Sequence, residues 1–170
     1  DGFLHYLDLG SQLNSLKKFT EKSIANKLNT ASLKNFKVEK NIEKDGQIVE
    51  TIKSGDHLLL QISKEPISTK GPRLTTELSL AGRYMVLTPF SDKVSVSQKI
   101  EKPEEKARLK KLIRSIKPHG FGVIIRTVAT GKKVAELDQD LKNLYKKWQV
   151  ISKKLKDSKA PTKILGELNR

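Results

Sequence analysis

The sequence predicts an α+β chain, and three observations lead to that prediction. Apolar or alternating runs that suit short strands recur between residues 57 and 125, interrupted by Gly and Pro. Stretches beginning at Pro103 and near Lys132 carry apolar residues at the three- and four-residue spacing of helices. The 170 residues, 36% hydrophobic and 31% charged, suffice for one domain or two small ones around a modest core.

The first third predicts few regular elements. Residues 2–7 suit a short strand, and Ser11 suits the cap of an imperfectly amphipathic helix whose apolar residues run to Ile24. Residues 29–55 are charged and weakly apolar, and Asp45-Gly46 is expected to form a hairpin turn.

The middle of the chain predicts several strands. The first spans 57–62 and leads into a loop that contains Lys70. Two more are expected over 74–80 and 83–87, separated by Ala81-Gly82, and a half-buried one over 94–100.

Helices and one further strand complete the pattern. Pro103 suits the first position of a helix with core residues at Leu109, Leu112, Ile113 and Ile116. Residues 121–125 form a strand that is apolar on both faces and ends at Arg126-Thr127.

The longest expected helix spans about 132–157. Its apolar residues alternate three and four apart: Val134, Leu137, Leu141, Leu144, Trp148, Ile151 and Leu155. This stripe suits either a coiled-coil dimer or packing on a sheet of the same chain. Because strands precede it directly and need cover, we expect the intrachain arrangement, a monomer, and a core position for Trp148.

The charge balance indicates the class of partner. The chain has 34 Lys+Arg and 19 Asp+Glu, a net charge of +15, with a pI of about 9.9 and a mean hydropathy of −0.51. A surplus of this size favours a polyanionic partner. No single lysine pair identifies this partner, because each pair suits a solvated helix face; the summed charge is what indicates it. The pairs on expected helices are Lys17-Lys18, Lys110-Lys111, Lys146-Lys147 and Lys153-Lys154.

Several classes of protein are excluded or disfavoured. The chain has no cysteine, which excludes disulfides and thiolate zinc sites, and its three histidines lack metal-ligand spacing. No apolar run approaches the ~18–20 residues of a membrane span, and the N-terminus lacks the features of a signal peptide. Because the sequence begins at Asp1, we expect a cytoplasmic piece of a longer chain.

The acidic residues do not predict a catalytic metal site. Metal-assisted chemistry on phosphates needs carboxylates that converge on one point. Glu104 and Glu105 are adjacent and suit the first turn of a helix, whereas Glu136 and Asp140, four apart, suit solvated charges on an outward helix face. We therefore expect no catalysis by this chain alone.

The segment from Phe121 to Gly131 suggests an anion site. An arginine fork and a threonine hydroxyl at a strand end suit phosphate oxygens, although an arginine that merely reaches solvent gives the same local pattern. Gly82 could let backbone N–H groups approach a ligand, and a tight turn explains it equally well.

Several strings, in order over nearly the whole chain, resemble the ribonuclease E/G family of bacterial endoribonucleases. They are Gly2-Phe3-Leu4, Lys64-Glu65-Pro66-Ile67-Ser68-Thr69-Lys70-Gly71-Pro72, Thr75-Thr76-Glu77-Leu78-Ser79-Leu80-Ala81-Gly82-Arg83-Tyr84 and Gly122-Val123-Ile124-Ile125-Arg126-Thr127. The resemblance is weakest between about residues 10 and 55.

The resemblance implies an OB-fold RNA-binding domain followed by a sensor of the RNA 5′-monophosphate. Arg126 and Thr127 fall on the family's phosphate-gripping pair, and Gly82 and Val86 fall on positions that line its pocket. Phe3 and Lys70 match an aromatic residue and a lysine that contact RNA, in keeping with base stacking and backbone neutralisation.

The chain departs from the family in two respects. Gln98-Lys99 stands where the family often has an arginine pair, which leaves open whether either residue contacts phosphate. The chain lacks the first strands of the OB domain, and it ends before the region that would bind magnesium, so no cofactor is expected in this chain and Mg²⁺ is expected in the longer parent protein.

Together these observations predict a partial OB-type β-barrel with a helical insertion, then a small sheet covered by two helices. The expected domains are 1–76, with the charged insertion at about 11–55, and 77–158, with 159–170 as a linker toward a catalytic region. The expected function is to bind single-stranded RNA and to sense its 5′-monophosphate. The parent protein is expected to be a magnesium-dependent endoribonuclease that acts in RNA processing and decay. We expect this piece to be a monomer, and the sequence leaves the oligomeric state of the parent open. The alternative is a non-catalytic RNA- or ribosome-associated scaffold that dimerises through the helix over 134–155.

Overall fold

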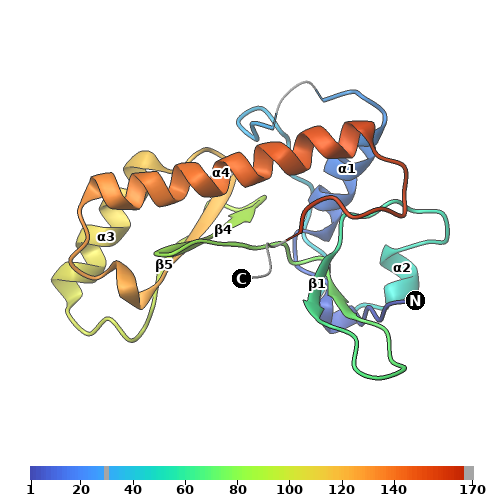
Figure 1. The fold of residues 1–170 in the computed structure, drawn as a ribbon, viewed down its shortest axis with the longest axis horizontal. Coiled ribbons are helices and arrows are strands. Elements are labelled where there is room, and N and C mark those ends of the chain that lie inside the picture. Colours follow the sequence, from blue (N-terminus) through green and yellow to red (C-terminus); the bar gives the residue numbers. More distant parts are fainter. Residues whose placement is uncertain (29–30, 167–170) are drawn as a thin grey trace. The chain divides into compact units, whose positions relative to one another are not determined.

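The computed structural model describes residues 1–28 and 31–166. It separates into two compact units, one built from Asp1–Asn29, Lys37–Leu78 and Leu155–Lys163, the other from Thr30–Phe36, Ser79–Lys154 and Ile164–Arg170. The elements, in chain order, are η1 (Tyr6–Asp8), α1 (Leu13–Ile24), α2 (Ile48–Thr51), β1 (Gln61–Lys64), β2 (Arg73–Thr75), β3 (Leu80–Ala81), β4 (Met85–Pro89), β5 (Val94–Val96), α3 (Pro103–Ile116), β6 (Phe121–Ile125), η2 (Thr127–Ala129) and α4 (Val134–Asp157) (Figure 1). The α+β class is therefore confirmed. Residues 29–30 of the expected insertion and 167–170 of the expected linker lie outside the described residues.

The sheet of the first unit is a two-stranded antiparallel hairpin. β1 pairs with β2, with Gln61 opposite Thr75, and Phe3 joins β2 through an isolated parallel bridge to Arg73. The strand expected over 2–7 is thus reduced to this bridge, because the chain turns at once into η1, where the Asp8 N–H donates to the His5 carbonyl at 2.9 Å.

The expected OB-type partial barrel is not confirmed. The described residues form no closed barrel, and the strand expected over 57–62 is displaced to Gln61–Lys64. Its sequence Leu58-Leu59-Leu60 packs as irregular chain, in which Leu59 is buried.

The helix expected after Ser11 is confirmed as α1. It begins after Gln12 and buries Leu13, Leu16 and Phe19. In the described part of the segment between α1 and β1, the short helix α2 is the one regular element. The turn near Asp45 is not flanked by strands, so the expected hairpin there is wrong.

An ion pair closes the first unit across η1 and β2. The Arg73 guanidinium donates to Asp8 through Nε at 3.1 Å and Nη2 at 2.8 Å. The hydrogen bond and charge of Arg73 lower the pKa of the Asp8 carboxyl, with a smaller contribution from His5, so the pair is formed above the acid range.

The second unit contains a four-stranded sheet of order β3-β4-β6-β5. β4 runs antiparallel to β3 and β6, and β5 runs parallel to β6. The strand β6 was predicted at its observed bounds. Phe121, Val123 and Ile125 are buried on one face, whereas Ile124 on the other is 47% exposed, so the two apolar faces of β6 differ in how far they are covered.

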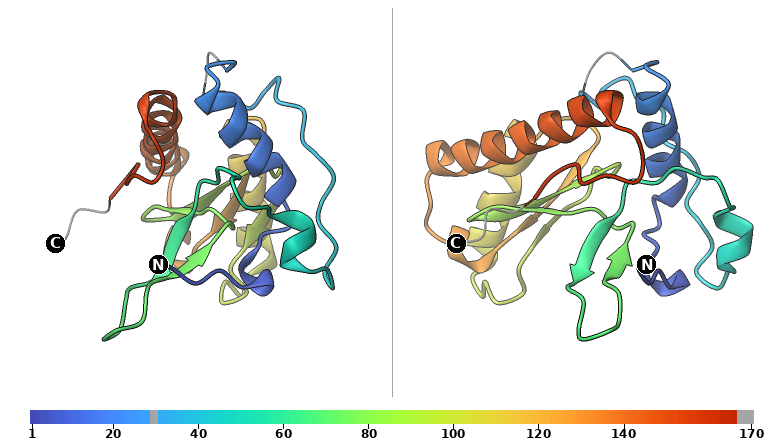
Figure 2. Two further views of the ribbon diagram at one scale, coloured as in Figure 1. Left: turned by 90° about the vertical axis from the view of Figure 1, so that its right-hand side faces the viewer. Right: turned by 45° about the vertical axis from the view of Figure 1, so that its right-hand side comes forward.

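Two helices cover the buried face, as predicted. α3 begins with Pro103 in its first turn, buries Leu109 and Ile113, and contacts β5 and β6. α4 crosses the sheet (Figure 2). The Trp148 ring meets the Phe121 ring edge-on at a centroid distance of 5.6 Å.

The apolar stripe of α4 is confirmed as an intrachain core, with one exception. Its buried members are Leu137, Leu141, Leu144, Trp148, Ile151 and Leu155. Val134, at the first turn, is 45% exposed. None of the helices in the described ranges is long and apolar enough to cross a bilayer.

Candidate functional site

Arg126 stands at the end of β6 with part of its guanidinium engaged. Its backbone is extended (φ −83°, ψ 159°) and its N–H donates to the Tyr84 carbonyl at 2.8 Å. Strand alternation then places its side chain on the open face, with Ile124. Nη1 donates to the Gly82 carbonyl at 2.9 Å, which fixes the plane of the fork. Its other N–H groups donate to no residue in the described ranges.

Thr127 follows directly and opens η2. Its Oγ1 lies 2.8 Å from the Oγ of Ser97. Ser97 comes from the segment after β5, and its N–H donates to the Ile125 carbonyl at 2.9 Å. Sequence reasoning missed Ser97, because nothing in its local pattern indicates a partner thirty residues further along the chain.

Gly82 begins the tight turn between β3 and β4. Its own N–H donates to the Met85 carbonyl at 2.8 Å, and the N–H groups of Arg83 and Tyr84 donate to the Asp140 carboxylate at 3.0 and 2.8 Å. These three backbone donors are therefore already paired. Of the two interpretations of Gly82, the turn is the one this geometry supports.

Asp140 also explains why residue 82 lacks a side chain. A Cβ on Gly82 would lie 2.7 Å from a carboxylate oxygen of Asp140. Since Asp140 is half-buried and accepts two backbone N–H groups, the prediction that it is a solvated charge on an outward helix face is wrong.

Val86 lies on the same open face of the sheet. It pairs with Ala81 of β3 and with Ile124 of β6, so these three side chains form one row across the sheet. Val86 is half-buried and gives the row an apolar centre beside the end of β6.

Further cations surround this end of the sheet. The Arg83 guanidinium and the Lys132 ammonium lie 5.3 and 5.7 Å from the centroid of the Tyr84 ring. Gln98 and Lys99 are exposed in the turn that Ser97 opens. The arrangement offers an oriented arginine, hydroxyl groups and positive charge, which suits a small anion such as a phosphate group.

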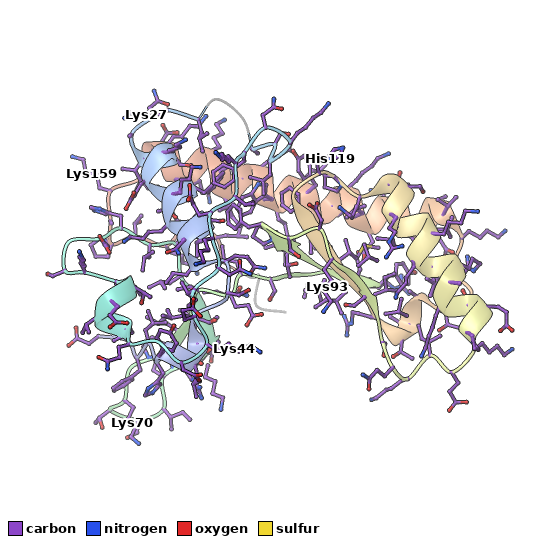
Figure 3. All side chains as sticks on the ribbon, turned by 180° about the vertical axis from the view of Figure 1, so that it is seen from behind. Lys27, Lys44, Lys70, Lys93, His119 and Lys159 are labelled. Carbon is purple, nitrogen blue, oxygen red and sulfur yellow. The ribbon has the colours of Figure 1, made fainter. Side chains whose placement is uncertain are left out.

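Phe3 and Lys70 belong to the first unit and lie on adjoining segments there. Phe3 is 52% exposed beside β2, and Lys70 lies in the exposed loop between β1 and β2 (Figure 3). The backbone carbonyl of Asp1 packs against Gly71, so the first residues run alongside 71–73. Exposed aromatic rings and lysines are side chains that bind single-stranded nucleic acid, the ring by stacking on a base and the lysine by neutralising the backbone.

The described part of the chain holds no group of three or more His, Cys, Asp or Glu side chains that could bind a metal ion. Its residues thus do not fit the magnesium site expected of the parent protein.

The end of β6 thus carries an oriented arginine beside two hydroxyl groups, in a chain with a net charge of +15. The model of the Ribonuclease E/G family matches residues 79–170, more than half of the sequence, so the chain belongs to that family.

Individual relatives agree with this assignment. Ribonuclease E of Synechocystis sp. (strain ATCC 27184 / PCC 6803 / Kazusa) is 40% identical over 116 residues, which cover 68% of this chain and 17% of the relative. Ribonuclease G of Haemophilus influenzae is 38% identical over 134 residues, 79% of this chain and 26% of the relative. Ribonuclease G of Escherichia coli (strain K12) is 39% identical over 121 residues, 71% of this chain and 25% of the relative. The chain therefore spans about a quarter or less of the length of the curated relatives it matches.

Proposed function

We propose that this chain is the RNA-binding and 5′-monophosphate-sensing part of a ribonuclease E/G-type endoribonuclease that acts in RNA processing and decay in the cytoplasm. Arg126 and Thr127 would bind the terminal phosphate, with Gly82 and Val86 forming the pocket wall. Phe3 and Lys70, on an OB-type surface, would contact the single-stranded RNA. Hydrolysis, and the Mg²⁺ it needs, would belong to the longer parent protein.

The observation that carries the proposal is the guanidinium of Arg126. One of its nitrogen atoms donates to the Gly82 carbonyl, and the remaining donors are left for a ligand. A fork held in one orientation by the backbone favours a bidentate phosphate contact over a loose ion pair. Thr127, next in the chain, adds a hydroxyl group beside that of Ser97.

A terminal monophosphate differs from an internal diester in charge and in the number of free oxygen atoms. A 5′-hydroxyl end leaves the site's donors without the anion they are arranged for. That loss is worth about 1–3 kcal/mol, or roughly tenfold to a hundredfold in affinity.

The test compares one short single-stranded RNA with a 5′-monophosphate and with a 5′-hydroxyl. We expect the wild-type chain to prefer the monophosphate by roughly tenfold to a hundredfold. Arg126→Ala and Thr127→Ala should each lower this ratio, Arg126→Ala more strongly because it removes the charge.

Arg114→Ala is the matched control, because Arg114 is an exposed arginine on α3 and its loss changes the net charge equally. It should weaken both RNAs by the same small factor. Equal binding of the two RNAs by the wild type, or equal weakening of both by Arg126→Ala, would contradict the proposal.

A further inference from the structure

The hydroxyl groups of Ser97 and Thr127 form a pair whose direction matters. Each hydroxyl carries one proton, so only one of the two can donate across the 2.8 Å between them. If Thr127 donates to Ser97, it has no proton left for a ligand. If Ser97 donates to Thr127, the Thr127 proton stays available.

A backbone group next to the pair favours the second direction. The Lys99 N–H donates to the Ser97 Oγ at 3.3 Å. A hydroxyl that accepts a hydrogen bond becomes a better donor, because hydrogen bonds in a chain polarise one another. An anion beside Thr127 adds to this preference, since a phosphate oxygen can only accept.

Ser97 is also firmly placed. Its N–H donates to the Ile125 carbonyl and its own carbonyl accepts the Ile100 N–H at 3.1 Å, so the residue is tied to the end of β6 and to its own turn. These two backbone hydrogen bonds hold Ser97 in place, so its hydroxyl stays beside that of Thr127.

We propose that Ser97 is a positioning residue for the 5′-phosphate site: it donates its hydroxyl proton to Thr127 and so orients the Thr127 hydroxyl with its own proton toward the phosphate. The chain of donors runs from the Lys99 N–H through Ser97 and Thr127 to a phosphate oxygen. The inference rests on the proposed function, and Ser97 itself needs no contact with RNA.

The experiment is a double-mutant cycle read as the ratio of affinities for the 5′-monophosphate and 5′-hydroxyl forms of one short single-stranded RNA. Ser97→Ala should lower this ratio by about threefold to tenfold, the range of one hydrogen bond. In a Thr127→Ala background the same change should have no further effect. Ser97→Thr, which keeps a hydroxyl, should retain the ratio.

Ser91→Ala is the matched control. The Ser91 Oγ also accepts the N–H of the residue two positions later, that of Lys93 at 3.2 Å, but Ser91 follows β4 at the opposite end of the sheet. It should leave the ratio unchanged. Ser97→Cys preserves the side-chain size with a weak donor and should lower the ratio as Ser97→Ala does, which separates loss of the donor from misfolding.

The outcomes separate this inference from the function on which it rests. A wild type that binds both RNAs equally overturns the sensing function and the inference together. A discriminating wild type with an unchanged ratio in Ser97→Ala overturns the inference alone. An equal effect of Ser97→Ala with and without Thr127 would mean that Ser97 contacts the phosphate itself, which also overturns the positioning role.

Discussion

At the scale of single residues, the Asp140 carboxylate holds a backbone turn in place, which a fully solvated helix charge would not do. It pairs with the N–H groups of Arg83 and Tyr84 and so fixes the turn whose Gly82 carbonyl holds the Arg126 guanidinium. Charge-assisted hydrogen bonds of this kind are among the stronger ones in proteins. The position of the arginine fork thus depends on a residue that lies fourteen positions beyond it in the chain.

Replacing this carboxylate should destabilise the second unit. Asp140→Ala leaves the part-buried N–H of Tyr84 and the exposed N–H of Arg83 without their acceptor, so we expect the free energy of unfolding to fall by about 1–3 kcal/mol. Urea denaturation followed by circular dichroism measures the change.

Asp138→Ala is the control, because Asp138 lies on the same helix in an ion pair of 2.8 Å with the exposed Lys142. Pairs of this kind contribute only about 0.2–0.5 kcal/mol. Similar losses for the two variants would contradict the role assigned to Asp140.

At the scale of elements, α4 is fixed to its unit by aromatic packing. Trp148 is fully buried, its ring meets Phe90 and Phe121 edge-on, and its Nε1 donates to the Ala31 carbonyl at 2.9 Å. The apolar residues at heptad spacing thus serve to bury one face of α4 within the chain. A stripe that is buried within the chain is not available as a coiled-coil seam, which disfavours the scaffold alternative.

Truncation of this residue should be costly. Trp148→Ala removes the largest buried side chain and a hydrogen bond, so we expect a loss of about 3–5 kcal/mol in the free energy of unfolding. Circular dichroism is the suitable probe because Trp148 is the chain's single tryptophan.

Val150→Ala tests the same helix at a position that is 41% exposed. Its effect should stay within about 0.5 kcal/mol. A tolerated Trp148→Ala, or a dimer in sedimentation that Trp148→Ala dissociates, would favour the scaffold alternative.

At the scale of the whole molecule, the charge surplus is distributed over both units. Exposed lysines include Lys27, Lys44, Lys70 and Lys159 in the first unit and Lys93 in the second (Figure 3). Several basic groups are paired within the chain, among them Lys17 with Asp56 and Lys18 with Glu39. The net +15 remains, and a surplus of this size favours association with a polyanion.

Binding of single-stranded RNA should therefore be salt-dependent. The logarithm of affinity should fall linearly with the logarithm of salt concentration, by about 0.7 per phosphate neutralised. Lys70→Ala should reduce this slope, whereas Arg126→Ala should act chiefly on the 5′-monophosphate preference. A titration series between low and physiological salt measures both, and a flat response of the wild type would contradict the electrostatic role.

Local patterns were sufficient for some elements and not for others. Three elements follow from signals that lie close together in the sequence: β6 from its apolar run, α3 from the proline at its start, and α4 from the spacing of its apolar residues. The strand at 57–62 and the hairpin at Asp45 were misplaced, because a short strand is decided by the partner it pairs with. For β1 that partner is β2, whose position the local sequence does not contain.

The sequence by itself determined the α+β class, the basic charge, the two covering helices, and the arginine and threonine at the end of β6. Only the tertiary structure decided what holds those two side chains. Gly82 lies 44 positions before Arg126, and Ser97 lies 30 positions before Thr127. Hydrogen bonds over such separations depend on which strands become neighbours in the sheet and on where α4 crosses it. Their geometry therefore exists only once the sheet has formed.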